Sequence, residues 1–227
     1  MSGIAILALA SAAFVGTHFL MSHPLRASMV GALGEKGFAG VYTLVSLATF
    51  GWMIWAYPAA AAEAPQPLWD AGRAGFGAAT LLMWLGSVLF IGSLRRNPAF
   101  PRPGKPIEKF DEPNGVYAIT RHPMMWGFAL WGVVHAIVNP TTASLILAAT
   151  IAFLALVGAA LQDSKKEQLM GEVWRDYRAR TSFVPYGNGL KSADAFALVG
   201  GTLLWLVATW AHAALGYRPA GIWAFFG

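Results

Sequence analysis

Long stretches of the chain carry no Asp, Glu, Lys or Arg, and shorter polar segments separate them. The uncharged stretches are residues 1–25, 37–62, 75–94 and 195–217, together with one longer run, residues 122–162. A helix needs about 20 residues to cross the ~30 Å hydrocarbon core of a bilayer. The longer run holds two spans, because Asn139-Pro140-Thr141-Thr142 breaks it near its middle. The pattern predicts an all-α integral membrane protein, a bundle of about six transmembrane helices.

The polar segments differ in their expected structure. Gly31 and Gly34 are expected to break the chain between the first two spans. Residues 95–121 contain five prolines, so this segment cannot form one regular helix. Residues 163–180 are expected to form a cytoplasmic amphipathic helix, which ends at Phe183-Val184-Pro185. The apolar residues of that helix share one face: Leu169, Met170, Val173, Trp174 and Tyr177.

Basic residues are distributed unequally between the two sides of the membrane. Six spans place all sixteen Lys and Arg residues except Arg73 and Arg218 on one side. By the positive-inside rule that side is cytoplasmic. Residues 1–25 are expected to be a first span and not a cleaved signal peptide, because no basic residue precedes their apolar core. We therefore expect a multi-pass protein of the bacterial inner membrane with both termini in the periplasm.

Composition agrees with a membrane protein and narrows the chemistry. The 227 residues are 56% hydrophobic and 12% charged, whereas soluble domains have about 25% charged residues. The isoelectric point near 9.7 is high, but the basic residues lie between apolar runs, so we expect the lipid bilayer as partner and no nucleic acid. Cysteine is absent, which excludes a thiolate metal site and a cysteine nucleophile. A metal or haem ligand would have to be His, Met, Tyr or a carboxylate.

Three of the five histidines, His18, His135 and His212, lie within predicted spans. A histidine inside a membrane either hydrogen-bonds to a neighbouring helix or serves a site, and three in one small bundle favour a ligand site. Haem b requires one or two axial histidines and no covalent cysteine. The depths of these histidines in the membrane are compatible with three pairs of haem ligands: His18 with His135, His18 with His122, and His135 with His212. Depth alone does not select among these pairs.

The fifth span begins with Arg121-His122-Pro123. Proline suits the first turn of a helix, and the free N–H groups there, beside Arg121 and His122, form a natural anion site. Such a site could take a haem propionate, a carboxylate or a nucleotide-like cofactor.

The next polar segment carries Asp163, Glu167 and Glu172, which we expect mainly as ion-pair partners of the nearby basic residues. Glu167 is in addition a candidate for a functional role. The basic residues in question are Lys165, Lys166 and Arg175.

Several motifs occur in a fixed order along the chain. They are Gly16-Thr17-His18, Gly34-Glu35-Lys36 followed by Tyr42-xxx-Ser46-Leu47, the ITRHP motif of residues 119–123 with His135 in the same span, and YRARTSFVPY of residues 177–186. In this order and spacing they resemble the NnrU family of bacterial membrane proteins, which is named after gene clusters for nitrite and nitric oxide metabolism. The resemblance implies a single NnrU-like transmembrane domain across residues 1–227.

The NnrU family is similar to 15-cis-zeta-carotene isomerase, a membrane enzyme that contains haem b. This resemblance implies that His18 and His135 bind haem b, and Arg121 and His122 are further candidates for cofactor binding. The implied role is redox or nitric-oxide-linked chemistry, or isomerisation of an apolar polyene, with an apolar small molecule or a gas as ligand. The isomerase has a cysteine three residues before the second histidine, where this chain has Gly132.

Two other functions are compatible with the same residues. Arg121-His122-Pro123, Gly127, Glu167 and Trp174-xx-Tyr177 also resemble, more distantly, the isoprenylcysteine carboxyl methyltransferase superfamily. This implies a methyltransferase that uses S-adenosylmethionine beside Arg121, His122 and Glu167, although Met125 stands where that superfamily has an aromatic residue. The third hypothesis is a non-catalytic accessory protein of denitrification.

Overall fold

The described structure consists of helices and the segments that connect them. The computed structural model describes residues 1–95, 97–98 and 109–225, and within these ranges it contains no β-strand. In chain order the elements are α1 (Gly3–Ser22), α2 (Arg26–Glu63), α3 (Gly72–Gly92), α4 (Val116–Ile119), α5 (Pro123–Val138), α6 (Thr142–Met170), α7 (Glu172–Arg180), α8 (Ala195–Ala214) and the 3-10 helix η1 (Ile222–Phe225). The predicted all-α class is confirmed.

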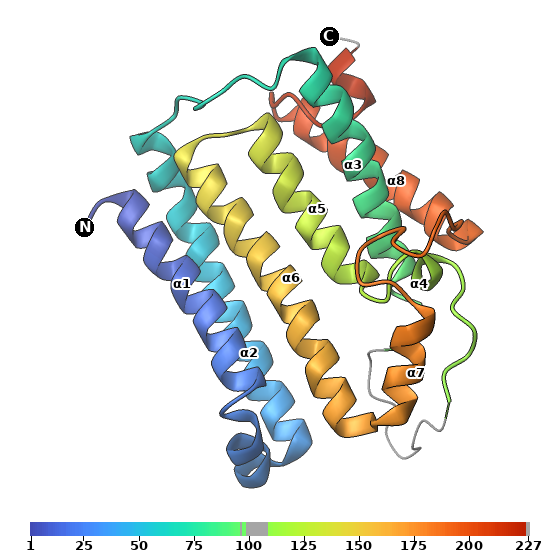
Figure 1. The fold of residues 1–227 in the computed structure, drawn as a ribbon. Helices are drawn as coiled ribbons and strands as arrows, with labels where there is room; N and C mark the ends of the chain where they lie inside the picture. The colour runs from blue at the N-terminus through green and yellow to red at the C-terminus, as the bar shows by residue number, and fades with distance from the viewer. Residues whose placement is uncertain (96, 99–108, 226–227) are drawn as a thin grey trace.

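The long helices stand side by side (Figure 1). Helix α1 packs against α2, α6 packs against both α1 and α5, and α3 lies between α5 and α8. The short helices α4 and α7 lie in the lower half of the view, and the two chain termini lie toward the opposite end. The lower ends of α1, α2 and α6 therefore share one end of the bundle with α7.

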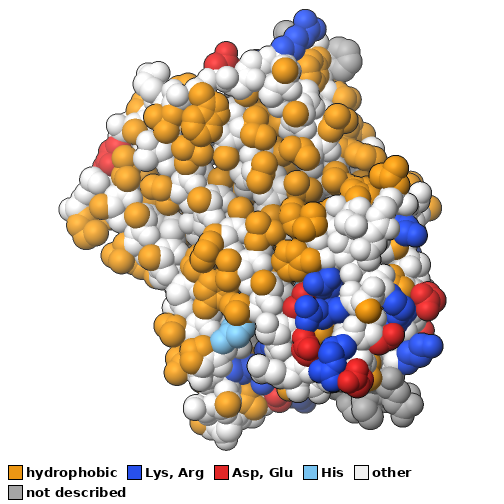
Figure 2. Space-filling view, viewed as in Figure 1, with side chains coloured by type: hydrophobic (Ala, Val, Ile, Leu, Met, Phe, Trp, Pro, Cys, Tyr) orange, Lys and Arg blue, Asp and Glu red, His pale blue; other side chains and the backbone are white. Residues whose placement is uncertain are grey.

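The helices have the length and the surface of membrane spans. Among the described helices, α1, α2, α3, α6 and α8 are long and apolar enough to cross a membrane. Helix α5 is equally apolar but has 16 residues, roughly 24 Å of helix. Large apolar side chains point outward, as at Trp55, which is 73% exposed. Figure 2 shows hydrophobic side chains over most of one face, with charged ones gathered at its lower end over α7. The predicted multi-pass architecture is confirmed.

The second helix begins earlier than predicted. Residues 26–33 were expected to be a linker and are helical. The break falls at Gly34, whose φ of 69° and ψ of 167° are readily adopted only by glycine. Across this break Arg26 pairs with Glu35 at 2.9 Å. The predicted break at Gly34 is confirmed, whereas the one at Gly31 was wrong because Gly31 continues the helix.

The predicted amphipathic helix is divided in two. Helix α6 continues to Met170, the chain turns at Gly171 with φ of 55°, and α7 begins at Glu172. The turn changes which face points inward, so Trp174 and Tyr177 are buried against Phe110. Leu169 lies before the turn and is 68% exposed. The prediction is therefore correct for α7 and wrong for residues 163–170, which extend a spanning helix.

Helices α5 and α6 form the predicted hairpin, broken at Asn139–Thr141. Thr141 caps α6, since its side chain accepts a hydrogen bond from the Ser144 N–H at 3.3 Å. Further along, a Cβ atom added at Gly132 would lie 2.6 Å from the Ala148 carbonyl oxygen. The two helices approach too closely for any side chain at residue 132, including the cysteine of the isomerase.

Candidate functional site

A buried charge cluster lies where α5 begins. The Arg121 guanidinium contacts both oxygens of Asp163 on α6, with its Nη2 donating to Oδ2 at 2.7 Å. His122 Nε2 lies 2.9 Å from Asp163 Oδ1, and because the carboxylate accepts, the imidazole donates. All three residues are buried. Arg121 Nη1 also donates to the Thr181 carbonyl at 3.3 Å, which connects the cluster to the segment after α7.

The cluster is internally satisfied. The sequence indicated that an anion could bind beside Arg121 and His122, and in the structure the chain's own Asp163 lies there. A buried ion pair is strongly destabilised when one partner is removed, by about 3–5 kcal/mol. The main role of these contacts is therefore to hold the start of α5 against α6. Asp163 was expected to be a surface ion-pair partner, and this expectation was wrong.

Glu167 lies one turn beyond Asp163 and faces α7. It pairs with Arg178 and, at 3.6 Å, with Arg175. These side chains are partly exposed, so each pair adds little stability. Nearby, burial raises the pKa of the Tyr177 phenol. Glu167 thus connects α6 to α7. The expected pairing with Arg175 is present, and Arg178 is an additional partner that was not predicted.

His135 and His212 lie close together. Their ring centroids are 6.3 Å apart, and His135 stacks on Trp131 at 3.9 Å. The Nδ1 atom of each ring lies within 2.8 Å of a backbone carbonyl four residues earlier. A carbonyl can only accept, so both Nδ1 atoms carry protons and both Nε2 atoms keep free lone pairs. His212 is exposed at the outside of the helix row.

An apolar cavity of about 520 Å³ lies between α1, α2, α5 and α6. Its walls are largely aromatic and aliphatic, and they include Phe14, Phe50 and Phe128. His18, which the sequence singled out, lines it from α1. His135 is not among the lining residues that the structure describes.

The His18 imidazole is fixed by its neighbours. Nδ1 donates to the Phe14 carbonyl at 2.7 Å, so Nε2 bears the free lone pair. The Phe14 ring meets the imidazole edge-on, with centroids 4.4 Å apart, and the Tyr42 ring lies 5.5 Å away. A hydrogen bond from the second ring nitrogen is how proteins orient histidines that ligate metals. His18 is thus arranged to offer Nε2 as a ligand beside an apolar cavity.

Comparison of the sequence with known proteins identifies the family of the chain. The family model for NnrU protein matches residues 6–219. The chain belongs to the NnrU family. It is also 29% identical over 119 residues to a methanethiol S-methyltransferase of Pseudomonas deceptionensis. That match covers 47% of this chain and 44% of the methyltransferase, so it spans less than half of either protein. No solved structure matches the chain.

Two NnrU motifs far apart in sequence pack on one another. The Thr120 hydroxyl donates to the Phe183 carbonyl at 2.6 Å, and the Arg121 N–H donates to the Ser182 carbonyl at 2.9 Å. The Tyr186 N–H donates to the Ile119 carbonyl at 2.9 Å. The motif that contains His18 lies elsewhere, on the cavity. These motifs therefore lie in two places, a structural joint at the start of α5 and the wall of the cavity on α1.

Sequence reasoning missed several residues of both places in this NnrU protein. Asp163 could have been recognised, because it is the first charged residue after the longest uncharged run and so extends a spanning helix. His23, Tyr42 and Lys165 also line the cavity. They come from separate helices, and no spacing in the sequence marks them as neighbours.

Proposed function

We propose that this protein binds haem b in the cavity between α1, α2, α5 and α6, with His18 as an axial ligand of the iron. The observation that carries the proposal is the His18 imidazole, whose Nδ1 is held by the Phe14 carbonyl while Nε2 is left free beside an apolar cavity. The proposed role is redox or nitric-oxide-linked chemistry in the bacterial inner membrane.

The residues present fit a haem. The cavity volume of about 520 Å³ lies within the ~300–1,000 Å³ range of ligand pockets in proteins. Haem b needs an apolar pocket and one or two ligands, and it needs no cysteine. In the described part of the chain no three His, Cys, Asp or Glu side chains gather around a metal site, but a single imidazole is enough for a haem iron.

The chain's own residues would control the cofactor. Haem held there would supply one-electron transfer and the binding of a small gas. The Phe14 carbonyl orients the His18 ring and increases the basicity of Nε2. Phe14, Phe50 and Phe128 would provide apolar walls for the porphyrin. The pairing of His18 with His135 on one iron stays a prediction of the family resemblance, since His135 contacts Trp131 and His212 instead.

The orientation in the membrane is part of the proposal. The lower end of the bundle carries α7 and the basic segments, and the chain termini lie toward the other end (Figure 1). By the positive-inside rule, we assign the α7 end to the cytoplasm and the termini to the periplasm. The proposed haem then lies in the cytoplasmic half of the protein.

An absorption spectrum tests the haem proposal. The protein would be expressed with a supply of haem, purified in detergent, and measured in the oxidised and the dithionite-reduced state. We expect a Soret band, sharp α and β bands on reduction, and a stoichiometric amount of haem b by the pyridine haemochrome assay. A protein that stays colourless after reconstitution with haem would contradict the proposal.

A second candidate function is methyl transfer from S-adenosylmethionine to a small thiol. It is favoured by the similarity to the methanethiol S-methyltransferase and by the Arg121-His122-Pro123 motif. The reaction would move a methyl group from the sulfonium to a thiolate sulfur and release S-adenosylhomocysteine. Incubation with S-adenosylmethionine and methanethiol should then produce dimethyl sulfide. Formation of that product by a haem-free preparation would favour the methyltransferase over the haem protein.

A further inference from the structure

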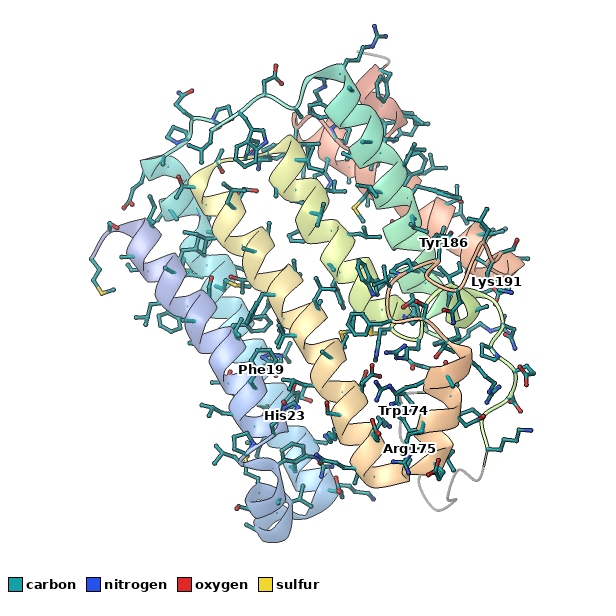
Figure 3. All side chains as sticks on the ribbon, viewed as in Figure 1. Phe19, His23, Trp174, Arg175, Tyr186 and Lys191 are labelled. Atoms are coloured by element: carbon teal, nitrogen blue, oxygen red, sulfur yellow. The ribbon has the colours of Figure 1, made fainter. Side chains whose placement is uncertain are left out.

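The lower end of the cavity differs in chemistry from its apolar walls. His23, Ser22, Gln162 and Lys165 line this end. Figure 3 shows His23 below Phe19 at the lower end of α1. His23 follows the last residue of α1, and Lys165 comes from the corresponding end of α6. The cavity therefore has an apolar body and one polar, basic end.

The His23 imidazole has an unused hydrogen-bonding group. Its Nδ1 lies 2.8 Å from the Ser22 hydroxyl oxygen, and its Nε2 is buried without a partner among the described residues. In the tautomer that accepts at Nδ1, the Ser22 hydroxyl donates to that atom. The ring proton then sits on Nε2. A buried N–H without an acceptor is costly. Nε2 has almost no accessible surface in this position, so an oxygen of a ligand in the cavity would satisfy it after the imidazole turns toward the cavity.

Lys165 supplies a charge at the same end. It is half-buried, and within the described residues no carboxylate lies within ion-pair distance of its Nζ. Arg26 and Lys166 are near enough to repel it, and the carboxylate of Glu35 is already paired with Arg26 at 2.9 Å. Among the described residues, this end therefore has three cations, Arg26, Lys165 and Lys166, against the single carboxylate of Glu35, which gives a net positive charge.

We propose that His23 and Lys165 form a carboxylate subsite, so that the cavity takes an apolar molecule that ends in a carboxylate. The identity of the ligand rests on the proposed haem function. In a haem protein, the carboxylate would be a haem propionate and the porphyrin would lie between the aromatic walls. A fatty acid has the same chemistry, an apolar body with one acidic end. The subsite itself follows from the two unused donors and is independent of which of these molecules binds.

The test compares each acid with its ester. Haem b and haem b dimethyl ester are titrated into the apoprotein in nanodiscs, followed by the Soret band. A parallel titration uses cis-parinaric acid and its methyl ester, followed by fluorescence. We expect the acid form of the true ligand to bind about tenfold or more tightly than its ester, because a charge-assisted hydrogen bond is lost on esterification. Lys165→Met should abolish this preference, and His23→Leu should reduce it.

Lys166→Met is the matched control. Lys166 is the next residue on α6, is equally half-buried, and does not line the cavity, so its replacement should keep the preference for the acid. Equal binding of acid and ester by the unaltered protein, or a preference that survives in Lys165→Met, would overturn the subsite. If neither haem compound binds, the haem proposal fails by itself, and the parinaric acid titration still decides whether the subsite exists.

Discussion

Replacement of Asp163 by Asn is expected to lower the free energy of unfolding by about 3–5 kcal/mol, the usual cost of leaving one partner of a buried ion pair uncompensated. Asp163 accepts hydrogen bonds from both Arg121 and His122, and all three side chains are buried. The amide cannot neutralise the guanidinium, so a positive charge stays buried without a partner. Chemical denaturation in detergent, followed by tryptophan fluorescence, measures the effect.

Two further variants isolate the cause. Glu172→Gln removes a fully exposed partner of Arg175, and we expect no measurable change in stability. The double variant Arg121→Met with Asp163→Leu removes both charges, and it should be less destabilised than Asp163→Asn, because apolar residues of similar size often replace a buried pair without loss. An Asp163→Asn protein as stable as the unaltered one would show that the cluster does not hold α5 to α6.

Replacement of Gly158 by Phe is expected to block ligand binding without unfolding the protein. Gly158 lines the cavity, and a Cβ atom built there meets no other atom within 4 Å. A benzyl group at this position would therefore project into open space and occupy part of the volume that the haem needs. We expect the affinity for haem to fall by about tenfold or more, with little change in the unfolding transition. A haem titration followed by the Soret band measures the effect.

Gly77 on α3 provides the matched control. A Cβ atom at Gly77 also meets nothing within 4 Å, but Gly77 does not line the cavity. Gly77→Phe should therefore bind haem as the unaltered protein does. If both variants bind haem equally well, the haem does not occupy this cavity.

Much of the fold could be predicted from the sequence because charge is excluded from the bilayer. The spans, the break after Val138 and the burial of Trp174 and Tyr177 all follow from where charged and helix-breaking residues occur. Helix boundaries were less predictable. Helix α6 extends into a charged segment because Asp163 is neutralised inside the protein by Arg121, and a count of charges along the chain cannot reveal that pairing.

The candidate site could be predicted only in part. An intramembrane histidine is conspicuous in the sequence, so His18 was found. His23 and Lys165 were not recognised as its neighbours, and Tyr42 was noted only as part of a family motif, because the cavity forms where four helices meet and depends on how each one rotates about its axis. The same dependence separates His18 from His135: spacing along the chain gives depth in the membrane but does not give the direction in which a side chain points.

Haem content of two histidine variants tests the central proposal most directly. His18 and His212 both lie on spanning helices and both donate Nδ1–H to the carbonyl four residues earlier, but only His18 lines the cavity. The proposal predicts that His18→Ala, purified after expression with haem, loses the Soret band, whereas His212→Ala keeps it. A His18→Ala protein that retains its haem while His212→Ala loses it would contradict the proposal and place the cofactor at His135 and His212.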